Sequence, residues 1–388
     1  MTGGIDFAAF RSEPAANALV GRITSLLKRA GGTPENPIAL MEVCGTHTVA
    51  ISRYGLRTML PPGLRLLSGP GCPVCVTPLI EIDRSIAAAT VPDVIVATFG
   101  DMMRVPGSHR SLESVRADGA DVRIVYSPMD ALETARRNPK KLVVFLGVGF
   151  ETTSPIIAAT LVAAAREGIS NFTVLPFFKT VPAALDMLAA VPGRPLDGFI
   201  CPGHVSVIIG SDAYLPVARD RNIPCVVTGF EPLDILAGIV MLLEQIVAIR
   251  EATGSAGVAV QYSRAVTPEG NTTAQGLMDD VFAVYDAEWR GIGVVPATGQ
   301  TLSKKYEMFD ATKRLKIDVP EPEGERGCIC GEIMLGRNLP PDCPHFGAAC
   351  TPRSPVGPCM VSTEGSCAAF YKYEQSWRSE GPDGTEAE

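Results

Sequence analysis

The sequence predicts an α/β protein built on parallel sheets with helices on both faces, followed by a smaller part rich in cysteine. Three observations lead to this prediction. Short apolar runs alternate with helix-like segments from residue 37 to residue 250. The runs are apolar at successive positions, as in strands that are buried on both faces of a sheet. Six of the eleven cysteines lie in the last part of the chain, from Cys328 to Cys367.

The first element is a helix over residues 12–30, because Leu19, Ile23 and Leu27 recur at helical spacing and two glycines end the pattern. The strands that follow are expected at Ile38–Val43, Leu64–Leu67, Val94–Thr98, Val122–Tyr126, Leu142–Leu146, Phe172–Phe177, Gly198–Ile200 and Cys225–Thr228. Helices are expected between them at Thr77–Ala89, Thr153–Glu167, Pro182–Ala190 and Pro232–Ile249. After about residue 256 the alternation is lost, and residues 379–388 read as a frayed polar tail.

A chain of 388 residues is long enough for two or three domains. The polar stretch Arg136–Pro139 interrupts the alternation and is the expected boundary between two α/β domains. The sequence therefore predicts a first α/β domain over residues 1–135, a second over 136–255, and a C-terminal domain with a polar tail over 256–388.

Composition excludes some classes of function. The 34 basic residues are outnumbered by 42 acidic ones, which argues against wrapping nucleic acid. Glu151 and Glu244 interrupt the longest apolar runs before they reach the roughly 18 residues that a membrane span needs. No basic stretch followed by an apolar one opens the chain, so we expect a cytoplasmic protein.

Reactive side chains follow the expected strands. In parallel sheets, ligands bind at the carboxyl ends of the strands. Cys44 and His47 follow the first strand, and a thiolate beside an imidazole suits a transition metal or an assisted nucleophile. The alternative for that pair alone is a buried cysteine beside a capping threonine. His204 and Glu231 follow later strands. A residue that lines the cleft and a structural histidine explain His204 equally well, and Glu231 is explained by a favourable charge at the start of a helix.

Cys72 and Cys75 have the spacing of a redox dithiol and stand just before an expected helix, whose N-terminus would lower a thiol pKa. Half of a zinc site is the alternative. The glycine-rich run 147–153 lacks the lysine of a nucleotide loop, which disfavours nucleotide binding. Cys201 and Cys225 adjoin apolar runs and are expected in the core.

The C-terminal cysteines lie in a segment rich in proline and glycine and poor in large apolar residues. A metal centre would replace the missing core. Irregular spacing, without the paired knuckles of a zinc ribbon, favours an iron–sulfur cluster over zinc. Spacing alone does not choose four ligands among Cys328, Cys330, Cys343, Cys350, Cys359 and Cys367.

Five strings together resemble the HypD family of [NiFe]-hydrogenase maturation factors, over roughly residues 15–375. They are Met41–Thr48, Gly69–Pro78, Pro202–Ser206, Gly229–Pro232 and Cys350–Gly365. The resemblance implies two Rossmann-like or thioredoxin-like α/β domains and a third domain that carries a [4Fe–4S] cluster. It also implies a redox-active scaffold that, with HypC, assembles the Fe(CN)2CO group. HypE would deliver cyanide that it makes with HypF, and the hydrogenase large subunit would be reached through HypC. A monomer within that complex is expected.

The resemblance also implies residue roles. Cys44 would bind the iron that carries cyanide and carbon monoxide, with His47 as an acid–base neighbour, and Cys72 and Cys75 would be the redox dithiol. The family spacing of 14, 6 and 16 intervening residues selects the cluster ligands Cys328, Cys343, Cys350 and Cys367. Cys330 and Cys359 are then spare and are candidates for a thiol pair near the cluster; Glu364 is a further candidate site residue.

Two competing hypotheses remain at the level of sequence. A stand-alone cluster-dependent disulfide reductase would reduce an external disulfide with Cys72 and Cys75 and would bind no iron at Cys44. A zinc-stabilised interaction protein would have no redox role, and would be colourless with stoichiometric zinc. The reactive set of Cys44, His47, Cys72 and Cys75 argues against mere binding.

Overall fold

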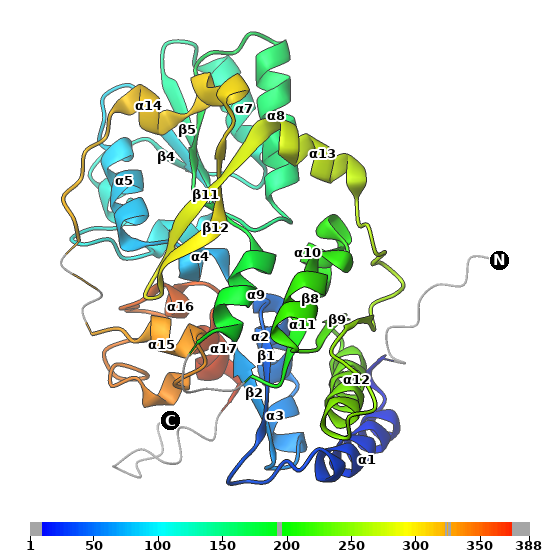
Figure 1. The fold of residues 1–388 in the computed structure, drawn as a ribbon. Helices are drawn as coiled ribbons and strands as arrows, with labels where there is room; N and C mark the ends of the chain where they lie inside the picture. The colour runs from blue at the N-terminus through cyan, green and yellow to red at the C-terminus, as the bar shows by residue number, and fades with distance from the viewer. Residues whose placement is uncertain (1–9, 192–195, 323, 325–326, 375–388) are drawn as a thin grey trace.

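The structure is a computed structural model, and it describes residues 10–191, 196–322, 324 and 327–374. Two parallel sheets form the body of the molecule, and the cysteine-rich segment lies beside their junction (Figure 1). The predicted fold class, parallel α/β sheets followed by a cysteine-rich part, is therefore confirmed.

The first sheet has five parallel strands in the order β10-β9-β8-β1-β2. Their bounds are β1 Ile38–Glu42, β2 Leu64–Ser68, β8 Gly198–Pro202, β9 Cys225–Thr228 and β10 Val258–Val260. Helices α1 (Glu13–Arg29) and α12 (Pro232–Arg250) pack an apolar cluster on one face of this sheet. Helices α9 (Val181–Ala189) and α11 (Leu215–Arg221) contribute to the cluster on the opposite face.

The second sheet has four parallel strands in the order β4-β3-β5-β6. Their bounds are β3 Val94–Thr98, β4 Val122–Ile124, β5 Leu142–Gly147 and β6 Phe172–Pro176. One face is covered by α5 (Leu79–Ala89) and α6 (Leu112–Ala117), and the other by α7 (Pro128–Arg137) and α8 (Ser154–Arg166). Both faces are apolar because both are covered, which explains the unbroken apolar runs of the sequence.

A third, antiparallel sheet was not predicted. Helix α13 (Thr272–Val281) leads into a hairpin of β11 (Phe282–Trp289) and β12 (Gly293–Leu302), which pairs with β7 (Phe178–Lys179). Burial along β11 is irregular and a register shift interrupts the pairing, so the hairpin has no clean alternation to reveal it. Figure 1 shows the hairpin running from the second sheet toward the cysteine-rich segment.

The remaining helices are short and lie mainly at the carboxyl ends of strands and in the cysteine-rich segment. They are α2 (Gly45–Arg53), α3 (Leu56–Met59), α4 (Pro73–Val76), η2 (Gly100–Arg104), α10 (Gly203–Ile209), η3 (Asp212–Tyr214), η4 (Lys304–Phe309), α14 (Ala311–Leu315), α15 (Cys330–Met334), η5 (Pro340–Asp342), α16 (Pro358–Val361) and α17 (Ser366–Tyr373).

The sheets do not follow the predicted division at 135/136. That position falls inside α7, a helix that packs on the second sheet and lies between strands β4 and β5 in the chain. The first sheet combines β1 and β2 with β8, β9 and β10, because the chain leaves it after β2, builds the second sheet and then returns. The predicted start of the last domain at 256 also lies just before β10, which pairs in the first sheet. The predicted tail over 379–388 lies outside the described residues.

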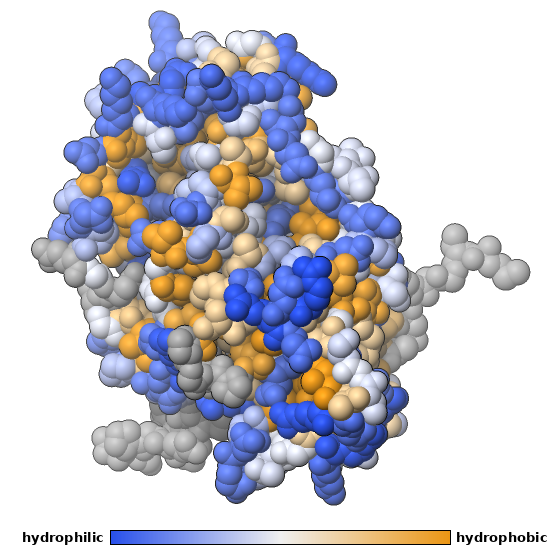
Figure 2. Space-filling model, in the orientation of Figure 1, coloured by the Kyte–Doolittle hydropathy of each residue, from blue (hydrophilic) through white to orange (hydrophobic). Residues whose placement is uncertain are grey.

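Helix α12 is long and apolar enough to cross a membrane by length and composition alone. Its apolar side chains, however, pack with α1 and the first sheet in one buried cluster. Ion pairs join Arg22 to Glu244 and Arg29 to Glu251 along its contact with α1. Figure 2 shows hydrophilic side chains along the lower edge of the molecule, where α1 lies. These contacts are those of a core helix.

Candidate cysteine-based functional site

The Cys44 loop and the Cys72 loop lie side by side, because they follow the neighbouring parallel strands β1 and β2. Cys44 immediately precedes α2, and it is partly exposed. The backbone N–H of Gly45 donates to the carbonyl oxygen of Gly71 at 3.0 Å. A Cβ at Gly71 would lie 2.5 Å from the backbone of Cys44, so only glycine allows this approach.

Two carboxyl groups flank Cys44. Glu42 is buried, and its carboxylate accepts from the backbone N–H of Cys44 at 3.0 Å and from the hydroxyl of Thr48. Glu364 packs against Gly45 and accepts from the Thr46 hydroxyl at 3.1 Å. Burial raises the pKa of Glu42 to about 7 and raises the pKa of Glu364. Burial likewise raises the pKa of the Cys44 thiol to about 12, and both carboxylates act in the same direction.

His47 is buried one helical turn from Cys44, as the spacing predicts. Its Nε2 lies 2.9 Å from the carbonyl oxygen of Gly229 and 2.9 Å from the Thr228 hydroxyl. The carbonyl can only accept, so Nε2 carries the proton, and Nδ1 has no partner among the described residues. Burial lowers the pKa of His47 to about 4, so the ring is neutral near pH 7.

The aromatic ring of Phe230 connects the strand-end motifs. It lies 4.7 Å from the His47 ring and 3.9 Å from the His204 ring, measured between centroids. The structure thus brings His204 to the same edge as His47. Glu231, by contrast, precedes α12 and forms an ion pair with Arg11 at 2.7 Å, which fits the plain reading of a charge at a helix start.

The carboxyl ends of the two sheets share a cavity of about 200 Å³. Pro73 and Val74 line it from the Cys72 loop, and Asp101 and Thr153 line it from the second sheet. Glu364 of the cysteine-rich segment completes the lining beside Ser362, whose hydroxyl donates to Asp101 at 2.9 Å. This cavity therefore joins loops from both sheets, but none of Cys44, His47, Cys72 and Cys75 is among its lining residues.

A four-residue helix, α4, separates Cys72 from the longer helix α5, and Cys75 lies within it. Cys72 precedes α4, and its sulfur accepts from the backbone N–H of Cys75 at 3.3 Å. Both residues are buried, at 3% and 2% exposure. The predicted lowering of the thiol pKa is wrong for Cys75: burial, followed by its contacts with Cys359 and Cys72, raises that pKa. Desolvation outweighs the short helix.

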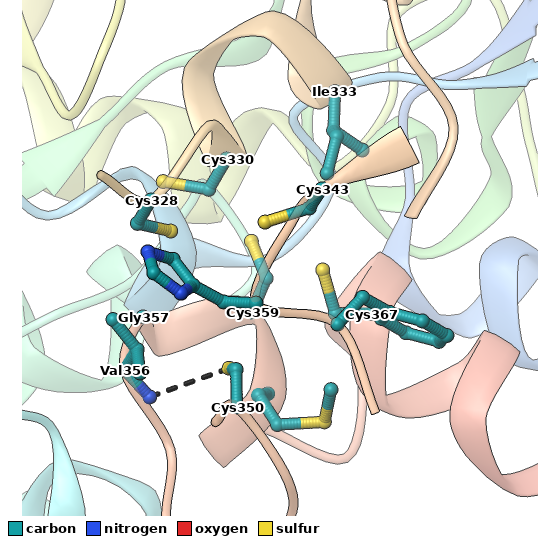
Figure 3. A pocket seen from close by; sticks show the side chains of 12 residues that line it. Cys328, Cys330, Ile333, Cys343, Cys350, Val356, Gly357, Cys359 and Cys367 are labelled. Carbon is teal, nitrogen blue, oxygen red and sulfur yellow. Dashed lines mark hydrogen bonds between the residues drawn. The ribbon is translucent and has the colours of Figure 1, made fainter. Parts of the chain in front are cut away.

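All six C-terminal cysteines line one pocket, with His345, Phe346 and Gly357 among its other residues. Figure 3 shows the sulfur atoms of these cysteines gathered around the pocket, with Cys359 at its centre. Five of the six are buried, and Cys328 is partly exposed. A Cβ at Gly357 would lie 2.5 Å from the Cys328 sulfur, so glycine makes room for that thiol.

The thiols form two groups of neighbours. Cys367 interacts electrostatically with Cys328, Cys330, Cys350 and Cys343, and burial together with these neighbours raises its pKa. Cys359 contacts Cys330 and Cys75, and these two thiols lower its pKa by hydrogen bonding to it. Cys330 in turn contacts Cys328. Neighbouring thiols that act on one another's pKa therefore form a series from Cys328 through Cys330, Cys359 and Cys75 to Cys72, within one packed cluster.

The donor set of this pocket fits a soft metal centre. Six convergent thiols and one imidazole line it, and none of the described carboxylates does. Within residues 10–191, 196–322, 324 and 327–374, no three His, Cys, Asp or Glu side chains are already arranged to coordinate a metal ion. The fit therefore rests on the chemistry and convergence of the donors.

Glu151, in the glycine-rich run, serves the fold. It is buried, and its carboxylate accepts from the backbone N–H of Val181 at the start of α9, at 2.9 Å. Cys201 and Cys225 are fully buried on neighbouring strands, as predicted for core cysteines.

Glu151 also provides a pH test. Burial raises the pKa of its carboxyl to about 7. Its contribution to stability is then full below the unfolded-state pKa, near 4.3, and is lost as pH rises through about 7. In the wild type, we expect this carboxyl to lower the free energy of unfolding by about 2 kcal/mol between about pH 5.5 and about pH 8. In Glu151→Gln that decrease should be absent. Urea unfolding at both pH values checks this. Glu35→Gln, at an exposed position, should change nothing; an equal slope in both variants contradicts the prediction.

Sequence reasoning missed two buried charged residues at the site. Glu42 ends an apolar strand, and a carboxylate at the end of a buried strand could have indicated a functional residue. Arg290 is buried at the tip of the β11–β12 hairpin, where its charge acts on Cys328 and Cys330 and its backbone N–H donates to Val76 at 2.9 Å. No local pattern marks Arg290, because its neighbours come from distant parts of the chain.

Comparison with known proteins shows matches along nearly the whole chain. The HypD family model, described as "Hydrogenase formation hypA family", matches residues 15–374. The hydrogenase maturation factor HypD of Rhodobacter capsulatus is 45% identical over 369 residues, which cover 94% of this chain and 97% of that protein. HypD of Escherichia coli K12 is 44% identical over 367 residues, covering 94% and 97%. HypD of Azotobacter vinelandii is 43% identical over 371 residues, covering 94% and 95%.

Proposed function

The chain belongs to the HypD family of hydrogenase maturation factors, and from that premise we propose that it is a redox-active scaffold for the Fe(CN)2CO group of [NiFe]-hydrogenases. One observation carries the proposal: the six-cysteine pocket and the dithiol beside the Cys44 loop are packed in one cluster, in which Cys359 interacts electrostatically with Cys330 and with Cys75. In this proposal HypC is the partner on the scaffold and HypE delivers cyanide.

Cys44 is the proposed iron ligand. Its thiolate is a soft donor that suits low-spin iron with cyanide and carbon monoxide ligands. Since burial and the carboxylates of Glu364 and Glu42 disfavour a free thiolate, a positive ion is what would stabilise the deprotonated sulfur. His47 holds a proton on Nε2 toward Gly229 and leaves Nδ1 able to accept one.

The proposed cluster ligands are Cys328, Cys343, Cys350 and Cys367, and a [4Fe–4S] cluster there would supply single electrons. The other three act electrostatically on Cys367, which supports their place around one centre, although Cys330 acts on it as well. Cys330 and Cys359 stand between the pocket and the dithiol. Cys72 and Cys75 can release two electrons and two protons as they form a disulfide.

The burial of the dithiol disfavours a stand-alone disulfide reductase. Attack on an external disulfide requires the sulfur to reach it, and Cys72 and Cys75 are 3% and 2% exposed. Contact with internal thiols is the arrangement that the structure provides instead.

Anaerobic purification followed by iron, sulfide and zinc analysis tests the proposal, together with absorption spectra before and after dithionite. We expect about four iron and four sulfide per chain and a visible band that bleaches on reduction. Co-purification with HypC should add iron that carries cyanide and carbon monoxide vibrations in the infrared. A colourless protein with one zinc would refute the proposal.

Gly71→Ala tests the placement of Cys44 without removing a thiol. The added Cβ would lie 2.5 Å from the Cys44 backbone, which must then shift. We expect iron binding with HypC to weaken on the order of tenfold, while cluster iron and sulfide stay unchanged. Gly21→Ala is the matched control, because nothing lies within 4 Å of its added Cβ. Normal iron loading of Gly71→Ala would show that the geometry of this loop is not required.

A further inference from the structure

A basic cavity of about 330 Å³ lies between η2, α6 and the loop that follows Cys350. Arg104, His109, Arg110 and Arg353 line it, and Glu113 is the one carboxylate among its described lining residues. The whole chain has a net charge of −8, so this cavity is a local reversal of sign. Such a reversal on an acidic protein favours the approach of a negatively charged partner.

Two of these arginines are available for a partner. Arg104 and Arg353 are exposed, and neither forms an ion pair with a carboxylate in the part of the chain that the structure describes. Arg104 donates to the carbonyl oxygen of Pro352 at 2.5 Å and so fixes the loop against η2. Arg110, in contrast, is already paired with Asp118.

The basic cavity and the six-cysteine pocket share one loop. Arg353, Ser354 and Pro355 line the basic cavity, whereas Cys350 and Gly357 line the cysteine pocket. The loop is tightly held: Thr351 and Ser354 exchange backbone hydrogen bonds at 3.1 and 3.2 Å. The sulfur of Cys350 accepts from the backbone N–H of Val356 at 3.3 Å. A molecule seated in the basic cavity would therefore contact the same loop whose neighbouring residues line the cysteine pocket.

We propose that the basic cavity docks a small acidic electron-transfer protein, which reduces the centre held in the cysteine pocket. The inference rests on the proposed function, which requires electrons but contains no source for them. The step is a single electron transfer: the reduced centre of the donor is oxidised by one electron and the cluster is reduced by one. No bond forms or breaks and no proton moves.

A protein partner fits better than a small anion. The two arginines without an ion pair among the described residues lie on different elements, the η2 segment and the 351–355 loop, and Glu113 lines the same cavity. A small anion would need cations that converge on one point, whereas an extended acidic surface can meet separated ones. Separated charges of this kind accelerate association more than they add affinity, which suits a transient electron donor.

The test uses the full chain and a [2Fe–2S] ferredoxin with an acidic surface as the probe. Binding is measured by titration calorimetry at low and high salt, and cluster reduction by anaerobic stopped-flow absorbance. We expect Arg353→Glu to weaken binding and slow reduction by about tenfold at low salt, and high salt to weaken wild-type binding. Arg353→Lys should retain most of the rate. Arg65→Glu, an exposed charge reversal on β2 of the other sheet, should stay within about twofold of wild type.

The outcomes separate this inference from the proposed function. Binding that is equal in wild type and Arg353→Glu overturns the docking site, whatever the cluster content. Binding of inorganic phosphate or of nucleic acid, without binding of the ferredoxin, overturns it as well. If iron and sulfide are absent but ferredoxin binding still depends on Arg353, the docking surface stands and the proposed function fails. Circular dichroism of each variant shows whether it is folded.

Discussion

Cys44→Ala is expected to abolish the loading of iron that carries cyanide and carbon monoxide while leaving the [4Fe–4S] cluster in place. The iron loaded with HypC should fall from about one per chain to near zero, because no other soft donor lies in the Cys44 loop. Cys44 follows β1, whereas the six-cysteine pocket is formed by the segment from Cys328 to Cys367. Iron analysis and infrared spectra of the complex with HypC give the readout.

Cys201→Ala is the matched control for Cys44→Ala. It also removes a single thiol from the end of a strand of the first sheet, but Cys201 is fully buried and lines neither the cysteine pocket nor the shared cavity. It should load iron normally. Loss of the cluster in Cys44→Ala would contradict the separation of the two sites, and normal iron loading would remove Cys44 as the ligand.

Cys343→Ala is expected to lose the cluster and to destabilise the cysteine-rich segment. Cys343 is 8% exposed and lies among the thiols that act on Cys367. Iron and sulfide should fall from about four per chain to near zero, since three remaining ligands hold a cluster poorly. The segment then unfolds more easily because a metal centre replaces the apolar core that it lacks. Metal analysis and limited proteolysis measure both effects.

Cys330→Ala is the informative comparison for Cys343→Ala, because Cys330 belongs to the same pocket but is proposed as a non-ligand. It should keep iron, sulfide and the visible band, and should lose only the contact between Cys328 and Cys359. A brown and stable Cys343→Ala variant would refute Cys343 as a cluster ligand. A colourless Cys330→Ala variant would show instead that Cys330 is a ligand.

The parallel strands could be predicted because burial on both faces leaves an unbroken apolar run. Val94–Thr98 and Cys225–Thr228 occur as predicted, and the other strand and helix bounds differ by a few residues. The hairpin of β11 and β12 could not be predicted, since its exposed and buried positions do not alternate. The assignment of each strand to a sheet could not be predicted either. β2 and β8 both flank β1, although all four strands of the second sheet lie between them in the chain.

Residue types and local spacing are enough to establish the chemistry: which thiols, imidazoles and carboxylates are present, their place at strand ends, and the family to which they belong. Which of these groups meet depends on the packing of the folded chain. This packing placed Cys359 between Cys75 and Cys330, set Glu42 and Glu364 beside Cys44, and brought Arg290 to the cysteine pocket. The physical reason is that periodicity records which positions are buried, whereas contacts between residues hundreds of positions apart depend on how whole sheets and loops pack.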